Sequence, residues 1–115
     1  MSRRSPEASL QDIVEAIRRI RVYTKKMDYD GFVQDTKTQD AVIRNIEIIG
    51  EAARNIPAPI TKDNPTIPWK QIAGTRDRLI HDYFGTNLDI VWNIVDQELS
   101  PLLEGIQKTL DKISA

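Results

Sequence analysis

The stretch "TKTQDAVIRNIEIIGEAARNI", residues 36–56, predicts a long helix at the centre of the fold. At about 100° per residue, its apolar side chains gather on one broad face and its charged side chains on the opposite face. Because so wide an apolar arc is more than one neighbour would cover, we expect this helix to contact several others. The apolar face holds Val42, Ile46, Ile49, Ala52, Ala53 and Ile56, with Ile43 and Ile48 at its edges, and the charged face holds Arg44, Glu47, Glu51 and Arg54.

Helical patterns continue on both sides of this stretch. Residues 6–27 carry apolar side chains at steps of three and four, with Ser5 as the N-terminal cap and Pro6 at the first helical position. The stretch "DYDG", residues 28–31, then breaks the helix. After the central helix, "PAPITKDNPTIP" (57–68) has four prolines in twelve residues and predicts a long loop within one domain.

Two further helices are expected after this loop. The third begins near Pro68, with a proline again at a plausible first position, and stops at Gly85. The fourth begins at Thr86, where Asp89 completes a pair that resembles a capping box.

The fourth helix carries apolar residues at near-heptad spacing as far as Ile113. Ser100–Pro101 falls in its middle, and either kinks one long helix or begins a fifth. Antiparallel helices with short connections make a bundle. The predicted fold is therefore an all-α, antiparallel bundle of four to five helices, with residues 1–115 as a single domain.

Composition restricts the class of protein. The 115 residues suit one globular domain, and a net charge of −1 lacks the basic excess of a non-specific nucleic-acid binder. The absence of cysteine excludes disulfides and thiolate metal sites, and it fits a reducing cytoplasm. The N-terminal stretch "MSRRSPEASLQD" has no apolar core for a signal peptide, and no apolar run approaches the ~20 residues that span a bilayer. We therefore expect a cytoplasmic protein without membrane contact.

The stretch "RDRLIHDYFG", residues 76–85, holds the only histidine of the chain. On a regular helix Tyr83 shares a face with Arg76, whereas His81 lies about 140° from Arg76, too far round for a side-by-side pair. Spacing alone favours Arg76 and His81 as ordinary polar residues at a helix end, and Tyr83 as packing at the edge of the core. If Arg76 and His81 act on one phosphate, either the helix ends at His81 or a second chain supplies the complementary group.

Elimination narrows the chemistry that this stretch could perform. The sequence shows no convincing metal site, no glycine-rich phosphate loop and no activated nucleophile, so we expect no cofactor. Metal-free cleavage of RNA remains, because RNA carries its own nucleophile in the 2′-hydroxyl group. Histidine suits the proton transfer and arginine the stabilisation of the phosphate. One histidine cannot easily be both acid and base in a turnover, so an active enzyme would be a dimer.

Other polar and aromatic residues have ordinary interpretations. Trp69 and Trp92 are interpreted as core anchors rather than platforms for base stacking. Arg44 and Arg54 are interpreted as solvated partners of Glu47 and Glu51 rather than as RNA ligands.

Beyond spacing, the chain resembles the HepT-like toxins of the HEPN superfamily. "RDRLIHDYFG" resembles their Arg-x4-His-x-Tyr signature, and the likeness extends to "IGEAARNIP" (49–57), "IPWKQIAGTRDRLIHDYFGTNLDIVWNIV" (67–95) and "LSPLL" (99–103). The resemblance implies an all-α bundle that forms a homodimer, with the motif helices facing each other across a cleft. The implied activity is metal-independent RNA endonuclease, as the toxin of a type VII-like toxin–antitoxin pair.

The resemblance also implies roles for single residues. Arg76 and His81 match the catalytic pair of the family, in a site composed from both chains. Tyr83 matches the tyrosine to which the partner, a minimal nucleotidyltransferase antitoxin, transfers AMP. The added anionic group would block the cleft and repel RNA phosphates. Arg78 is a candidate for RNA binding.

One departure from the family pattern leaves an alternative open. Asp77 stands where the family commonly has Asn, and this polar residue could orient Arg76 or His81, or pair with Arg76 or Arg78. Its negative charge beside an RNA-binding cleft, together with the near-neutral chain, favours a second hypothesis. In it the protein is a non-catalytic helical dimer that binds a nucleotidyltransferase partner or a nucleotide. A purely structural bundle leaves the clustering of these polar residues unexplained.

Overall fold

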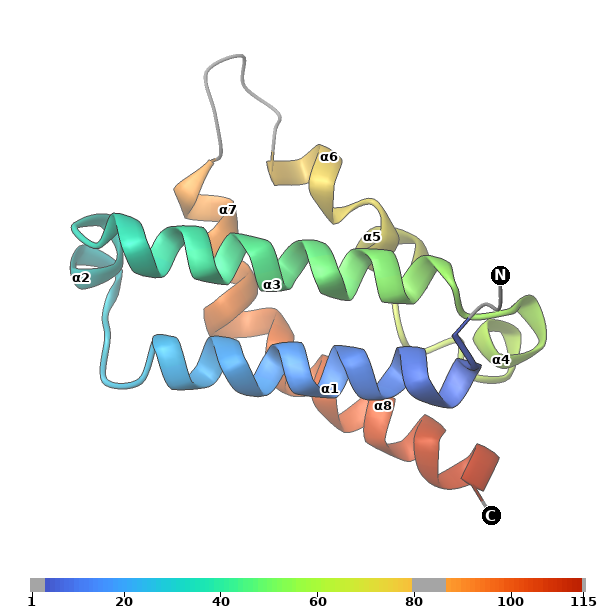
Figure 1. The fold of residues 1–115 in the computed structure, drawn as a ribbon. Helices are drawn as coiled ribbons and strands as arrows, with labels where there is room; N and C mark the ends of the chain where they lie inside the picture. The colour runs from blue at the N-terminus through green and yellow to red at the C-terminus, as the bar shows by residue number, and fades with distance from the viewer. Residues whose placement is uncertain (1–3, 80–86, 115) are drawn as a thin grey trace.

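Two long antiparallel helices, α1 (Pro6–Tyr23) and α3 (Thr36–Arg54), lie side by side along the molecule (Figure 1). The computed structural model describes residues 4–79 and 87–114, and every regular element within them is helical, so the predicted all-α class is confirmed there. A third long helix, α8 (Leu99–Ser114), packs against α1. The described residues form eight α-helical segments and one π-helical turn, more pieces than the four to five helices predicted.

The predicted role of the central helix is confirmed. α3 packs against α1 and also against α5, α6 and α7, which are defined below. Its apolar arc therefore meets several neighbours, as its width requires. Burial of one large apolar side chain contributes roughly 1.5–3 kcal/mol relative to exposure, so this arc supplies much of the driving force for folding. The six residues of the predicted apolar face are all buried: Val42, Ile46, Ile49, Ala52, Ala53 and Ile56.

Side-chain caps fix where α1 and α3 begin. The hydroxyl of Ser5 accepts a hydrogen bond from the Ala8 N–H at 3.1 Å, which confirms the predicted start of α1. Asp35 caps α3, since one carboxylate oxygen accepts from the Thr38 N–H at 3.0 Å and the other from the Thr38 hydroxyl at 2.8 Å. The hydrogen bond from the Thr38 N–H is the main reason that the pKa of Asp35 is lowered from its ordinary value.

The predicted end of α1 at Met27 is wrong, because the helix stops at Tyr23. Thr24 turns both its N–H and its hydroxyl to the carbonyl oxygen of Ile20. Lys26 then adopts a φ of 63°, in the left-handed region that a right-handed helix cannot include.

Two short helices lie where the sequence predicted a break and a loop. α2 (Tyr29–Val33) follows α1, and Asp28 caps it by accepting from the Gly31 N–H at 2.8 Å. α4 (Ala58–Asp63) lies inside the proline-rich segment. Pro59 fits there because the first turn of a helix does not use its N–H groups. The proline-rich segment is therefore not entirely a loop.

The third predicted helix is divided in two. α5 (Trp69–Ala73) and α6 (Thr75–Leu79) are separated at Gly74, and the remainder of the prediction, residues 80–85, lies outside the described residues. The fourth helix begins as α7 (Leu88–Asn93), two residues after the predicted Thr86, which is also outside the described residues.

A π-helical turn, η1 (Ile94–Glu98), joins α7 to α8 without a break. The N–H of Leu99 bonds to the carbonyl of Ile94, five residues earlier, instead of four. Pro101 lies just beyond and has no N–H to offer the preceding turn, so a widened turn here relieves the conflict between proline and a regular helix. Of the two predicted alternatives at Ser100–Pro101, the structure has one long helix with a local irregularity.

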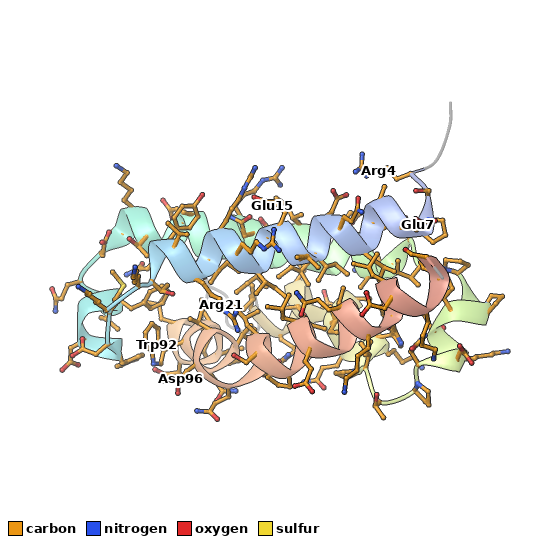
Figure 2. The ribbon with its side chains drawn as sticks, turned by 90° about the horizontal axis from the view of Figure 1, so that it is seen from below. Arg4, Glu7, Glu15, Arg21, Trp92 and Asp96 are labelled. Atoms are coloured by element: carbon orange, nitrogen blue, oxygen red, sulfur yellow. The ribbon has the colours of Figure 1, made fainter. Side chains whose placement is uncertain are left out.

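Figure 2 shows Arg21 and Trp92 near the same end of the long helices. Arg21 points from α1 toward α8, where its guanidinium donates to the Ser100 hydroxyl at 2.7 Å. Trp92 packs on the ring of Phe32 at a centroid distance of 5.3 Å, and Trp69 donates from Nε1 to the carbonyl of Asn64 at 3.0 Å. Both tryptophans are half-buried, which agrees with the prediction that they anchor the core. None of the described helices is both long and apolar enough to cross a membrane.

Candidate functional site

The helix α6, which carries Arg76, Asp77 and Arg78, is held close to the middle of α3. Gly50 of α3 makes this approach possible, because a Cβ added there would lie 3.2 Å from the carbonyl oxygen of Ile72. The buried Thr75 hydroxyl donates to the same carbonyl at 2.7 Å, just where α5 ends and α6 begins. The first residues of the motif are therefore fixed to the core by backbone and side-chain contacts.

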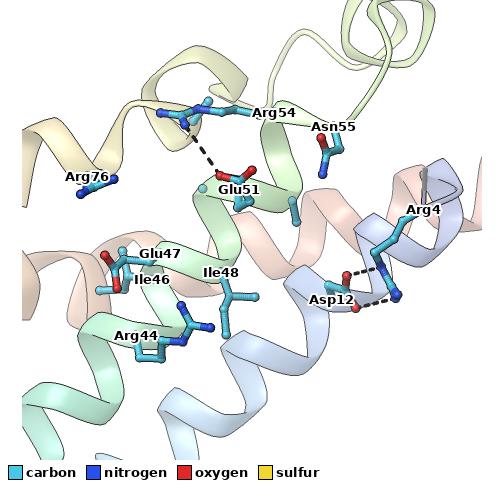
Figure 3. A pocket seen from close by; sticks show the side chains of 13 residues that line it. Arg4, Asp12, Arg44, Ile46, Glu47, Ile48, Glu51, Arg54, Asn55 and Arg76 are labelled. Atoms are coloured by element: carbon cyan, nitrogen blue, oxygen red, sulfur yellow. Dashed lines mark hydrogen bonds and ion pairs between the residues drawn. The ribbon is translucent and has the colours of Figure 1, made fainter. Parts of the chain in front are cut away.

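Arg76 is exposed and lies at the edge of a cleft of about 430 Å³ between α1, α3 and the α5–α6 turn (Figure 3). Among the residues that the structure describes, no carboxylate lies within ion-pair distance of its guanidinium. Four arginines and three carboxylates line the cleft, so it carries both signs of charge rather than one. The charged lining residues are Arg4, Arg44, Arg54, Arg76, Asp12, Glu47 and Glu51.

Ion pairs within the cleft agree only in part with the sequence analysis. Arg54 pairs with Glu51 at 3.7 Å, as predicted. The predicted pairing of Arg44 with Glu47 is wrong, because these two described side chains do not come within ion-pair distance. They face the cleft separately, and Figure 3 shows Arg44 turned away from the Glu47 carboxylate.

Arg78, unlike Arg76, has a carboxylate partner among the residues that the structure describes. Its two terminal nitrogens donate to the two carboxylate oxygens of Glu98, at 3.2 and 3.0 Å. The amide of Asn93 adds a third hydrogen bond to this carboxylate, at 3.3 Å. The pair joins α6 to the π-helical turn η1. Arg78 was singled out as a candidate for RNA binding, and that role stays a prediction.

Asp77 is exposed on α6, and its N–H bonds to the carbonyl of Gly74 at 3.0 Å. Although it lies between two arginines in the sequence, its carboxylate pairs with neither of them in the structure. Successive positions on a helix point about 100° apart, which separates these side chains. The expectation that Asp77 supports the site stays a prediction.

His81 and Tyr83 lie outside the described residues, so their predicted roles are not tested by the structure. The two flanks of this segment are described and lie together. The Asn87 N–H donates to the carbonyl of Leu79 at 3.0 Å, and the Asn87 side chain caps α7 by accepting from the N–H groups of Asp89 and Ile90. The last described residue before 80–86 and the first one after them are therefore held together by a backbone hydrogen bond.

Sequence reasoning missed Glu98, Asn93 and Gly50. Glu98 follows Arg78 by twenty residues, and no local pattern links the two. Gly50 lies inside the stretch that resembles the family, but its close approach to Ile72 depends on how the helices pack. Among the residues that the structure describes, no group of three or more histidine or acidic side chains is placed to hold a metal ion.

Comparison with known proteins assigns the chain to a family. Residues 13–109 match the family described as "Ribonuclease HepT-like". The chain is 44% identical over 110 residues to "Probable ribonuclease HepT" of Thermococcus cleftensis, covering 96% of this chain and 99% of that protein. It is also 41% identical over 113 residues to "Putative RNase MJ0127" of Methanocaldococcus jannaschii, covering 98% and 93%.

A third relative also carries a ribonuclease name. "Putative RNase TTE0752" of Caldanaerobacter subterraneus is 35% identical over 109 residues, which cover 95% of this chain and 97% of that protein. No solved structure matches the chain significantly. The family match spans far more than half of the chain, and the resemblance noted in the motif is thereby confirmed. The chain belongs to the HepT-like ribonuclease family.

Proposed function

We propose that this protein is a metal-independent RNA endonuclease whose active site is composed from both chains of a homodimer. The observation that carries the proposal is the difference between the two motif arginines. Arg78 is engaged by Glu98, whereas Arg76 is exposed at the edge of a cleft with no carboxylate partner in the described part of the chain. An exposed guanidinium without a partner is free to bind a phosphate with its paired donors.

The reaction needs proton transfer and stabilisation of charge. Neutral His81 would take the proton of the RNA 2′-hydroxyl, and the 2′-oxygen would attack the adjacent phosphorus. Arg76 would stabilise the negative charge that builds on the phosphate oxygens. The bond to the 5′-oxygen then breaks, and that oxygen receives a proton. The products are a 2′,3′-cyclic phosphate and a 5′-hydroxyl end.

A dimer supplies what a single chain lacks. The sequence has one histidine, so a base for the 2′-hydroxyl and an acid for the leaving oxygen call for two chains. A two-fold arrangement would bring both copies of the motif to one cleft.

In the cell, the proposed role is that of the toxin in a type VII-like toxin–antitoxin pair in the cytoplasm. The partner would be a minimal nucleotidyltransferase that transfers AMP to Tyr83. Tyr83 follows His81 by two residues in the sequence. AMP on Tyr83 would therefore add a negatively charged phosphate and a nucleoside close in the chain to the proposed catalytic pair. Both effects oppose RNA binding, the first by repulsion and the second by occupying space.

A second candidate is a non-catalytic dimer that binds the nucleotidyltransferase or a nucleotide. Two observations favour it: Asp77 adds an exposed carboxylate beside Arg76, and three carboxylates line the adjacent cleft. Both candidates expect a complex with the nucleotidyltransferase, but only the endonuclease cleaves RNA.

The deciding experiment measures cleavage of labelled RNA by the purified, unmodified protein. We expect cleavage by the wild type, and a loss of about 10²-fold or more in His81→Ala and in Arg76→Ala. Arg19→Ala, on the exposed face of α1, is the matched control and should keep full activity. Full activity in His81→Ala would overturn the proposed mechanism. No cleavage by the folded wild-type dimer would overturn the proposal and favour the binding module.

A further inference from the structure

The pair between Arg78 and Glu98 is the least exposed ion pair among the residues that the structure describes. The side chains of Arg78 and Glu98 are 29% and 33% exposed. In the other five described pairs at least one partner is more than half exposed. Fully exposed pairs contribute little because water and salt screen them, whereas a two-bond arginine–carboxylate pair that is partly shielded holds a fixed geometry.

The two partners come from elements on opposite sides of residues 80–86 in the sequence. Arg78 lies on α6, two residues after Arg76, and Glu98 lies on the π-helical turn beyond α7. The backbone hydrogen bond from the Asn87 N–H to the Leu79 carbonyl also joins the described residues on the two sides of 80–86. The described chain on the two sides of residues 80–86 is thus joined by one backbone hydrogen bond and by one side-chain ion pair.

The π-helical turn is tied to this arrangement. Glu98 is the last residue of the turn, and Asn93, which precedes it, donates to the Glu98 carboxylate. Widened turns of this kind are often found at functional sites. Here the turn ends at Glu98, whose carboxylate accepts hydrogen bonds from Arg78 of α6.

We propose that Glu98 is a positioning residue for the ribonuclease site: through Arg78 it holds α6, and so sets the place of Arg76. This inference rests on the proposed function. Arg78 then acts as a structural link to Glu98 and does not bind the RNA itself. A change at Glu98 would shift the place where Arg76 meets the phosphate, with little effect on how much RNA is bound.

Kinetics of Glu98→Gln separate this role from RNA binding by Arg78. Gln keeps the size of the side chain and removes its charge. If Glu98 positions the site, kcat falls by about 10- to 100-fold while KM stays within about twofold, because misplacement of a catalytic group by a fraction of an ångström affects the chemical step. If instead Arg78 binds RNA, releasing it from Glu98 lowers KM and leaves kcat unchanged, which would overturn the inference.

A charge exchange provides the second variant. Arg78→Glu alone should lower kcat as Glu98→Gln does. The double variant Arg78→Glu/Glu98→Arg should have a kcat at least about tenfold higher than that of Arg78→Glu. No recovery would mean that Arg78 acts by a contact of its own. Glu104→Gln is the matched control, since Glu104 forms an exposed pair with Lys108 on α8 and its loss should change neither kcat nor KM.

Hydrogen exchange tests the inference without relying on activity. In Glu98→Gln the amides of Arg78 and Asn87 should exchange several-fold faster, while those of α1 and α3 keep their wild-type rates. Unchanged exchange at Arg78 and Asn87 would overturn the inference even if RNA cleavage is confirmed. If the wild type cleaves no RNA, the proposed function fails. Exchange then still decides whether Glu98 holds α6.

Discussion

Gly50 of α3 lies against the carbonyl oxygen of Ile72, so close that a side chain at Gly50 would press on the turn that begins α6. The same carbonyl accepts the hydrogen bond of the buried Thr75 hydroxyl. This contact is one of those that hold α6 close to α3.

Gly50→Val tests this relationship. Its branched side chain has no room beside the Ile72 carbonyl, so we expect the free energy of unfolding to fall by about 1–3 kcal/mol, as is usual for overpacking. The measurement is urea unfolding followed by circular dichroism. Asp40→Val, on the exposed side of α3, carries the same cost of a β-branched residue in a helix and is the control. Equal effects of the two changes would show that Gly50 is not a packing constraint.

The cap formed by Asp35 predicts that the free energy of unfolding depends on pH, and Asp35→Asn tests this. The hydrogen bonds from Thr38 lower the pKa of Asp35 from its ordinary 3.8, so the folded state favours the charged form. Its contribution is therefore complete above 3.8 and is lost as the pH falls through the lower, folded-state pKa. The stability difference between wild type and Asp35→Asn, measured by unfolding across this range, should favour the wild type at neutral pH and shrink in acid.

Asp111→Asn, exposed on α8, controls for the loss of one negative charge. A stability difference for Asp35→Asn that stays constant from neutral to acid pH would contradict the assignment of the cap.

Cleavage is expected to need the RNA 2′-hydroxyl and no metal ion. EDTA should leave the cleavage rate within about twofold, because proton transfer and charge stabilisation are assigned to side chains. An oligonucleotide of the same sequence with 2′-deoxy sugars should remain uncut, since it lacks the nucleophile. Activity that EDTA abolishes and Mg²⁺ restores would point to a different mechanism, as would cleavage of the deoxy substrate.

Tyr83→Phe tests the proposed modification. Co-expression with a minimal nucleotidyltransferase should raise the intact mass of this protein by one or more AMP units and suppress cleavage. Phe lacks the accepting hydroxyl, so Tyr83→Phe should keep the unmodified mass. Tyr23→Phe, at the exposed end of α1, is the control and should still gain the mass. Modification that persists in Tyr83→Phe would place the accepting group elsewhere.

The sequence predicted what depends on local periodicity and local capping. The apolar face of α3 and the start of α1 at Ser5 and Pro6 follow from side-chain spacing and cap chemistry within a few residues. The short helix α2 was missed although Asp28 is a good cap, because Gly31 reads as a helix breaker. Pro59 hid α4 for a similar reason, since proline is compatible with a first turn but marks a loop in most contexts.

The candidate site was predictable as a motif but not as a set of contacts. The resemblance marked Arg76, His81 and Tyr83 by their order in the chain, and it marked Asp77 as a departure from the family pattern. Nothing local indicates that Glu98 would reach Arg78, because that depends on the π-helical turn and on how α6 meets η1. Tertiary geometry of this kind is set by the packing of several helices together.

The contact between α1 and α8 determines when the core can be completed during synthesis of the chain. Ile17 and Ile106 are both fully buried in the same core, yet nearly the whole chain separates them. During synthesis α1 leaves the ribosome long before α8, and until then part of its apolar face lacks its partner. The complete core can form only after residue 106 has emerged from the ribosome. The helices that support the proposed nuclease site can therefore reach their final positions only then. Ribosome-bound chains shorter than this are expected to be open and dependent on chaperones.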